Sequence, residues 1–190
     1  ITRADLISTI SRINTLYMIN NAGSGHIGTS FSSMDLISYI FFKFKITNEK
    51  QTDLFFSSKG HDAPAIYSIM SIFELIEFDK IHSLRRLNGL PGHPDIETDG
   101  IITNTGSLGM GISKAKGFIQ SSRLEGINRN VFVLLGDGEL QEGQIWESLR
   151  SASNDRMGEL YIIVDNNKIQ SDNWVELTSP NDNLTRKFKS

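Results

Sequence analysis

Two short polar clusters follow two apolar runs of the sequence. A Gly-Asp-Gly triplet at 136–138 comes directly after residues 131–135, and Asn166-Asn167 follows residues 160–164. Carboxylate and amide oxygens are hard ligands that suit Mg²⁺ or Ca²⁺ better than zinc. Mg²⁺ takes few protein ligands and completes its octahedron with phosphate oxygens and water. If the two runs are neighbouring strands, their ends converge and the clusters predict a metal-bridged phosphate site, although each cluster alone is also typical of an ordinary turn.

Three of the four histidines stand beside glycines. His26 follows Gly25, His61 follows Gly60, and His93 lies between Gly92 and Pro94. Glycine beside a polar side chain is typical of a loop that approaches a ligand closely. A neutral imidazole can also transfer protons near pH 7. The fourth histidine, His82, lacks such a setting, and we expect it on the surface.

The second half of the chain predicts the elements that position these groups. Residues 131–135 and 160–164 are continuous apolar runs, typical of strands that are buried on both faces of a parallel sheet. A helix is expected between them from about Gln141 to Asp155, which gives a strand–helix–strand unit. A glycine-rich turn at 104–111 should lead into another helix. The fold class is therefore α/β, with a mainly parallel sheet flanked by helices, and ligands of such folds bind beyond the carboxyl ends of the strands.

The first half predicts helices around one short strand. Leu6, Ile7, Ile10, Ile13 and Tyr17 recur at helical spacing, and the segment 20–23 should end that helix. Further helices are expected at 33–44 and from Pro64 to about Ile76. Between them, residues 54–56 indicate a buried strand, and residues 88–100 a loop rich in glycine and proline. The tail at 171–190 has almost no apolar periodicity and predicts a loop.

Composition excludes several classes of function. The chain of 190 residues is long enough for one domain with a core, and its formal net charge of −3 gives no basic field for nucleic acid or an anionic membrane. It contains no cysteine, which excludes disulfides and cysteine-ligated zinc and fits a cytoplasmic location. No apolar run reaches the length of about 18 residues that spans a bilayer, and there is no signal peptide pattern.

Several longer strings give the clusters a family context. The Gly-Asp-Gly triplet followed by Asn166-Asn167 resembles the thiamine diphosphate signature, and the strings below, in chain order, resemble transketolase. These are NNAGSGHIGTS (20–30), SSKGHDAPA (57–65), GLPGHPD (89–95), TNTGSLGMGISKAKG (103–117) and GDGELQEGQIWESL (136–149). The resemblance covers residues from about 5 to 172. It implies a thiamine-diphosphate-binding fold over residues 1–190, with thiamine diphosphate and Mg²⁺ as cofactors.

The resemblance also assigns residues to the cofactor. It implies that Mg²⁺ is held by Asp137, by Asn167 and by the backbone carbonyl of Ile169, and that the backbone N–H of Gly138 contacts the diphosphate. It further implies that the turn formed by Gly106, Ser107 and Leu108 lies along the cofactor, with Leu108 near its rings.

Other residues receive roles towards the substrate and a partner. By the resemblance, His61 contacts the diphosphate, while His26 and His93 face the hydroxyl groups of a sugar. The glutamate that matches Glu142 pairs, in the family, with the carboxylate of a second domain that activates the cofactor, although Glu142 is also an ordinary first-turn acid. Glu139 is expected either in solvent or at an interface, and Trp146 in the core.

The chain departs from the family's pattern in what it lacks. Nothing corresponds to the activating glutamate or to the arginines that bind the sugar phosphate, and a further diphosphate-contacting histidine lies beyond Ser190 in that pattern. The resemblance therefore implies a fragment, or the N-terminal subunit of a split transketolase. Such a chain needs a C-terminal subunit or a pyrimidine-binding domain, and it works as a homodimer of such pairs. The expected reaction moves a two-carbon ketol unit between sugar phosphates.

Two alternatives stay open at this point. The chain could belong to another thiamine diphosphate enzyme, of the deoxyxylulose-phosphate synthase or 2-oxoacid dehydrogenase type. It could also be a cofactor-binding or partner-binding module without an activity of its own.

Overall fold

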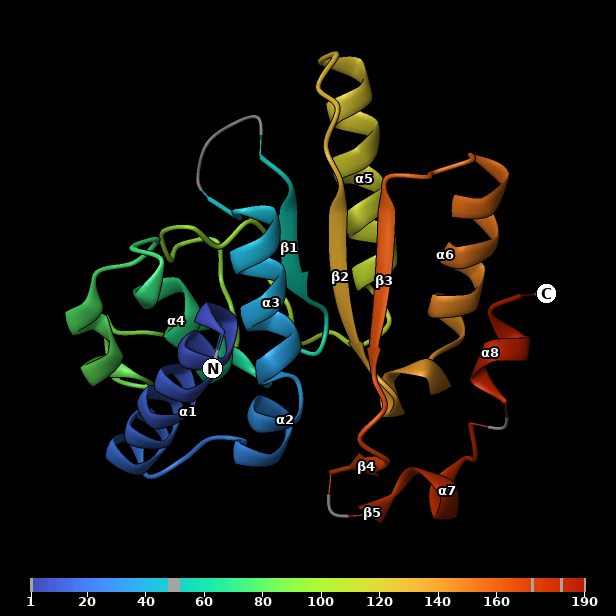
Figure 1. The fold of residues 1–190 in the computed structure, drawn as a ribbon. Coiled ribbons are helices and arrows are strands. Elements are labelled where there is room, and N and C mark those ends of the chain that lie inside the picture. Colours follow the sequence, from blue (N-terminus) through green and yellow to red (C-terminus); the bar gives the residue numbers. More distant parts are fainter. Residues whose placement is uncertain (1, 48–51, 172, 182, 190) are drawn as a thin grey trace.

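A three-stranded parallel sheet lies at the centre of the fold (Figure 1). The structure, a computed structural model, describes residues 2–47, 52–171, 173–181 and 183–189. The sheet has the order β1-β2-β3, and its strands are Leu54–Ser57, Val131–Gly136 and Leu160–Asp165. Leu54 of β1 lies opposite Val131 of β2, and Gly136 at the end of β2 lies opposite Asp165 at the end of β3. The predicted parallel α/β sheet is confirmed.

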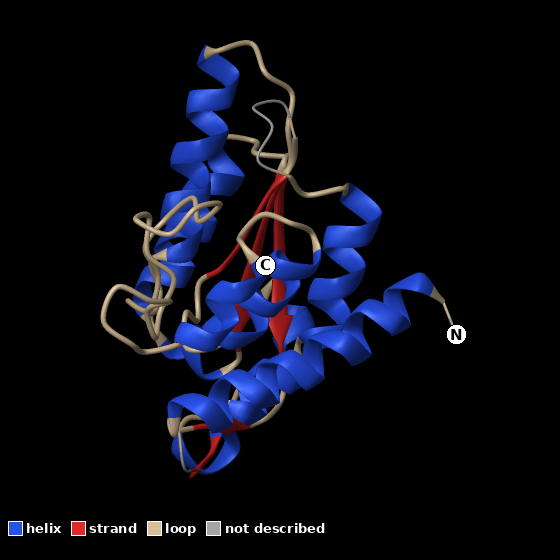
Figure 2. Ribbon diagram, turned by 90° about the vertical axis from the view of Figure 1, so that its left-hand side faces the viewer, coloured by secondary structure: helices blue, strands red, loops and turns tan. Residues whose placement is uncertain are grey.

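Helices cover both faces of the sheet, as the edge-on view in Figure 2 shows. The alternating side chains of β2 divide between two hydrophobic clusters, with Phe132 and Leu134 on one face and Val131, Val133 and Leu135 on the other. One face packs against α1 (Arg3–Ala22), α3 (Met34–Phe44) and α4 (Ala63–Ile72), and the other against α5 (Gly111–Leu124) and α6 (Gly143–Asn154). Because both faces of β2 are buried, its continuous apolar run is explained.

Helix α1 begins and ends where the sequence predicts. Thr2 and Asp5 form a reciprocal capping box at its start, and Gly23, with φ of 66°, ends it in the left-handed conformation. Its apolar stripe nevertheless faces outwards, since Leu6 is 54% and Ile13 63% exposed. The buried face is instead formed largely by small polar side chains, and these let the helix lie close to α3 and α4. They are Ser8, Ser11 and Thr15.

The other helices that the sequence predicts are present, but two of them have different ends from those predicted. α4 ends at Ile72 rather than near Ile76, and α6 begins at Gly143, after a short 3₁₀ helix at Gly138–Gln141 (η2). Helix α2 at Ile27–Ser32 and the 3₁₀ helix at Phe78–Ser83 (η1) were not expected. Short helices lack the repeated apolar spacing that reveals longer ones. The segment 88–100 is irregular, as predicted.

Two sequence-based expectations about the end of the chain are wrong. β3 is only partly buried, with Tyr161 46% exposed, because β3 is an edge strand in the part of the sheet that the structure describes. The tail is not a plain loop. It contains the antiparallel pair β4 (Ile169–Gln170) and β5 (Asn173–Trp174), then the single-turn helices α7 (Val175–Thr178) and α8 (Leu184–Lys187). Residues 172, 182 and 190 of the tail lie outside the described part.

None of the described helices is long and apolar enough to cross a membrane.

Candidate functional site

The two polar clusters meet at the carboxyl ends of β2 and β3. Gly136 lies opposite Asp165 in the sheet, and the backbone N–H of Asp137 donates to the Asp165 carbonyl at 3.2 Å. Beside these ends lies a cavity of about 780 Å³. Its walls come from the start of α2, from the loop after β1, from η2 and from β4. They include most of the residues that the sequence singled out, namely His26, His61, Leu108, Asp137, Gly138, Glu142, Asn167 and Ile169.

Asp137 and Asn167 are held in place by the neighbouring backbone. The carboxylate of Asp137 accepts hydrogen bonds from the N–H groups of Gly138 at 2.8 Å and Lys168 at 2.6 Å. The amide oxygen of Asn167 accepts from the N–H of Ile169 at 2.9 Å. Burial raises the pKa of the Asp137 carboxyl, and the two backbone donors oppose that change. The sequence thus places a desolvated carboxylate, without an ion-pair partner among the described residues, at the cavity wall.

This donor set fits a hard divalent cation. Asp137, Asn167 and Ile169 border one cavity, and a carboxylate, an amide oxygen and a backbone carbonyl are kinds of oxygen ligand that suit Mg²⁺. No group of three or more His, Cys, Asp or Glu residues that could hold a metal occurs in the part of the chain that the structure describes. A cation bound through several acidic side chains is therefore not supported there. One expectation meets a complication: the Gly138 N–H, assigned to the diphosphate, already donates to Asp137.

The structure brings the three glycine-flanked histidines into one region. The rings of His26 and His61 meet edge to face, with centroids 5.4 Å apart. The ring of His93 lies over Gly106, where a Cβ would come within 2.7 Å of its Cδ2 atom. His93 itself is not among the residues that line the cavity. His82, by contrast, is hydrogen-bonded to the hydroxyl of Tyr17 at 2.7 Å on an exposed surface, as expected.

Both His61 and His93 favour the neutral form. Burial lowers the pKa of His61, with Asp62 opposing and Lys59 adding to the change. Burial also lowers the pKa of His93, and Arg85 adds to that effect. The Nδ1 atom of His61 lies 3.0 Å from the Lys59 carbonyl, and since a carbonyl only accepts, Nδ1 carries the hydrogen. In the neutral ring, Nε2 is then left for a ligand.

In the glycine-rich turn that follows residue 104, the main chain comes very close to the main chain of the loop after β1. A Cβ on Gly60 would come within 2.5 Å of the Gly106 nitrogen, and Gly60, Gly106 and Gly109 all have positive φ. Leu108 is 40% exposed and lines the cavity. Its neighbours Gly106 and Ser107 are not among the lining residues.

Glu139 is the clearest residue that sequence reasoning misplaced. It is 2% exposed rather than in solvent or at an interface. Its carboxylate accepts from the N–H groups of Gly109 at 2.8 Å and Gly136 at 3.2 Å, and from the hydroxyl of Ser58. Burial raises the pKa of Glu139, and these three donors oppose the rise. The turn η2 folds the side chain back beneath the end of β2, and no single-sequence signal predicts that.

A buried ionic network was also missed. Lys59 is 1% exposed, and its ammonium group contacts Asp165 at 2.9 Å and Asp62 at 3.4 Å. It also donates to the hydroxyl groups of Thr29 at 3.0 Å and Ser33 at 3.4 Å. The network links the loop after β1 to the end of β3 and to the region of α2 that borders the cavity. The only signal in the sequence is a lysine beside glycine and histidine, which is too weak to indicate burial.

Glu142 and Trp146 both belong to the start of α6, and they differ in burial. Glu142 is exposed at the cavity, and its Cβ would contact a Cβ on Gly109 at 2.9 Å. Trp146 is half-buried rather than fully in the core: its indole N–H donates to the Leu140 carbonyl at 2.9 Å, and its ring lies 5.6 Å from that of Phe188. The role of Glu142 towards a partner stays a prediction.

Comparison with known proteins identifies a family. The family described as "Transketolase, thiamine diphosphate binding domain" matches residues 2–190. The chain is 32% identical to SqwG, a 6-deoxy-6-sulfo-D-fructose transketolase subunit of a Clostridium species, covering 96% of this chain and 69% of the relative. It is 31% identical to an apulose-4-phosphate transketolase subunit of Actinobacillus succinogenes, covering 90% of this chain and 64% of the relative.

Full-length transketolases are matched over a smaller part of their length. Human transketolase is 32% identical over 85% of this chain and 27% of its own. Among solved structures, transketolase from Campylobacter jejuni superposes with a TM-score of 0.89 at 27% identity, covering 96% of this chain and 31% of that one. This chain thus spans about two thirds of the separate subunits and about a quarter of human transketolase.

Proposed function

Because this chain belongs to the transketolase family and matches its thiamine diphosphate binding domain, we propose that it binds thiamine diphosphate through Mg²⁺ and forms one half of the active site of a ketol-transferring enzyme. The observation that carries the proposal is the convergence of Asp137, Asn167 and Ile169 on one cavity at the carboxyl ends of two parallel strands. Residues 1–190 would form this cofactor-binding domain. The assembled enzyme would work in the cytoplasm.

The residues of this chain would act mainly by holding the cofactor in position. Asp137, the Asn167 amide oxygen and the Ile169 carbonyl would hold the cation, which in turn neutralises the diphosphate. When bound, thiamine diphosphate would supply the carbanion chemistry of a two-carbon transfer. Leu108 offers an apolar surface for the rings, and the Gly138 N–H would serve the diphosphate if it were shared with or released by Asp137.

The histidines would handle the diphosphate and the protons of the sugar. His61 lines the cavity and is half-buried, which suits contact with the diphosphate. His26 and His93 are exposed at the same region and would face the hydroxyl groups of a sugar phosphate. Their imidazole nitrogens can accept and return protons near neutral pH.

A second protein surface would complete the site. Two relatives are named as subunits of transketolases, which supports a separate partner for this chain. We propose that a pyrimidine-binding domain or C-terminal subunit covers the cavity beside Glu142 and supplies the activating carboxylate, in a homodimer of such pairs. Glu142 is exposed in this chain and would share a proton with that carboxylate in the complex, since two ionised acids buried side by side would repel each other.

Calorimetric titration with thiamine diphosphate, with and without Mg²⁺, tests the site. We expect binding that requires Mg²⁺ and that is nearly abolished by Asp137→Ala and by Asn167→Ala. Asp99→Ala, which removes an exposed acid that does not line the cavity, is the matched control. Binding that needs no Mg²⁺, or that both site variants retain, would contradict the assignment.

A ketol-transfer assay tests the need for a partner. The chain with thiamine diphosphate and Mg²⁺ should be inactive alone and active after addition of a pyrimidine-binding subunit. Robust turnover by the chain alone would show that it carries an activating group of its own.

A further inference from the structure

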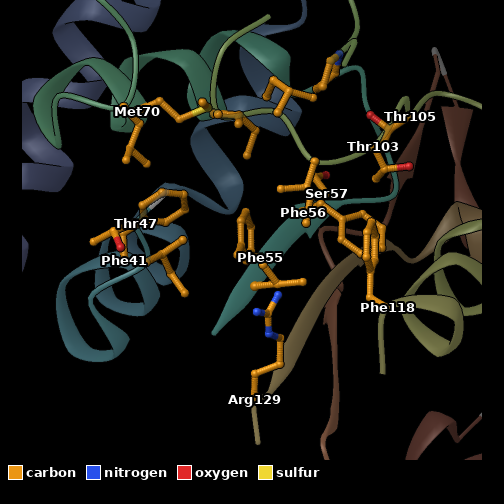
Figure 3. Close-up of a pocket in the computed structure, with 18 of the residues that line it drawn as sticks. Phe41, Thr47, Phe55, Phe56, Ser57, Met70, Thr103, Thr105, Phe118 and Arg129 are labelled. Carbon is orange, nitrogen blue, oxygen red and sulfur yellow. The ribbon is translucent and has the colours of Figure 1, made fainter. Parts of the chain in front are cut away.

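A second cavity, of about 260 Å³, lies along the outer edge of β1 (Figure 3). β1 is an edge strand among the described strands, so no strand of that set covers this side. All four residues of β1 line the cavity, and so do side chains from helices on both faces of the sheet. These include Phe41 of α3, Met70 of α4 and Phe118 of α5, with Ile101 and Ile102 from the loop before α5. The walls are therefore mainly apolar.

Two polar atoms at this cavity are buried without a hydrogen-bond partner. They are the Nε of Arg129 and the hydroxyl oxygen of Thr105. Figure 3 shows them at opposite ends of the view, with the guanidinium group of Arg129 directed towards Phe55. Buried polar groups in folded proteins are almost always hydrogen-bonded, so these two atoms are available to a polar group that enters the cavity. Among the described residues, no acid forms an ion pair with Arg129.

The backbone of β1 adds further polar groups on this side. The N–H groups of Leu54 and Ser58 donate to Asn130 and Leu134, at 2.9 and 2.8 Å, beside or within β2. In a parallel strand alternate residues direct both N–H and C=O to the same side, so Phe55 and Ser57 direct theirs to the outer edge. The cavity thus presents donors and acceptors along one wall and apolar side chains along the others. Small-molecule sites have this composition.

We propose that this cavity binds a small organic monocarboxylate with an apolar body. Its volume corresponds to about nine molecules of liquid water, which suits a ligand of about ten non-hydrogen atoms. The carboxylate would pair with Arg129, whose planar guanidinium group suits carboxylates. The body would lie along Phe55 and Phe118.

This site is separate from the cofactor cavity. The two cavities share no lining residue, and Arg129 lies at the amino ends of β1 and β2, whereas the cofactor cavity lies at the carboxyl ends. The proposal therefore does not depend on thiamine diphosphate binding. A failure of the cofactor experiment leaves it intact.

Octanoate and its neutral analogue 1-octanol are suitable probes, because they differ in the charged group alone. The chain is titrated with each while methyl resonances of Met70, Ile101 and Ile102 are followed by NMR. We expect saturable octanoate binding, with a dissociation constant of about 1 mM or lower, and shifts centred on these methyl groups.

Substitutions at Arg129 then decide the role of the charge. Arg129→Met keeps the apolar stem and should weaken octanoate binding by about tenfold or more, with 1-octanol binding unchanged. Arg129→Lys should keep octanoate binding within several-fold, and Arg150→Met, an exposed arginine of α6, should have no effect. Absence of saturation, equal octanoate binding by Arg129→Met, or shifts confined to the cofactor cavity would each overturn the proposal.

Discussion

The ammonium group of Lys59 lies 2.9 Å from the Oδ2 of Asp165, and this contact joins the ends of two strands that are not neighbours in the sheet. Lys59 follows β1, Asp165 ends β3, and β2 separates them. The pair is almost completely removed from solvent, with exposures of 1% and 8%. Lys59 also lines the cavity of about 780 Å³, so the contact links a wall of that cavity to the end of β3.

We predict that Lys59→Met is strongly destabilising. It leaves Asp62 and Asp165 buried without their cation, which costs about 3–5 kcal/mol. Urea unfolding measures the change. Lys80→Met is the matched control, because Lys80 pairs with the exposed Asp99 and should cost less than about 1 kcal/mol. Equal effects of the two substitutions would show that the buried network contributes no more than a surface pair.

We predict that Glu139→Ala loosens the turn that carries Leu108. The carboxylate of Glu139 binds the N–H groups of Gly109 and Gly136, and a hydrogen bond to a charged group contributes about 1.5–3 kcal/mol. Amide hydrogen exchange at these two glycines should become about tenfold faster or more. Glu147→Ala, at an exposed position of α6, should leave both rates unchanged. Unaltered exchange in Glu139→Ala would contradict the assigned role.

We predict a division of roles among the histidines in the assembled enzyme. His26→Ala or His93→Ala should leave thiamine diphosphate affinity within a few-fold and lower turnover by roughly 10²–10⁴. His61→Ala should instead weaken cofactor binding, because His61 lines the cavity. His82→Ala, which removes an exposed contact with Tyr17, is the control and should change neither quantity. The division is wrong if His26→Ala and His93→Ala weaken binding more than His61→Ala.

We predict that His61 makes the fold less stable in mild acid. Burial lowers its pKa from the ordinary value of 6.5, so the unfolded chain takes up a proton more readily than the folded one. Stability is therefore full above that value and falls as the pH drops through it. Unfolding free energies from about pH 8 to about pH 5 should fall less steeply for His61→Gln than for the unchanged chain. Parallel curves would show that His61 does not contribute.

The sequence predicts the sheet and the place of the polar cluster because both depend on local patterns. Residues 131–135 form a strand whose two faces are both buried, and the polar cluster at 136–138 has to follow at its carboxyl end. Asn167 reaches the same cavity because β3 is the parallel neighbour of β2. These relationships need only strand type and order, which apolar runs and chain spacing indicate.

The remainder depends on contacts between distant segments. Glu139 is buried by donors from Ser58 and Gly109, and Lys59 is buried against Asp165, more than a hundred positions away. No local pattern reports such contacts. The outward apolar stripe of α1 shows the converse, since helical spacing predicts the helix but not which face the rest of the fold covers.

The approach of Gly60 to Gly106 limits how this protein can evolve. A side chain at Gly60 would collide with the main chain of the neighbouring loop, at 2.5 Å from a backbone nitrogen, so no exchange of a neighbouring side chain can relieve it. In a randomised library, chains with any other residue at Gly60 should fail to fold, whichever substitutions they carry elsewhere. Variation in this loop must therefore come from exposed positions such as Ser107, whose side chain can change while the crossing of the two loops is inherited intact.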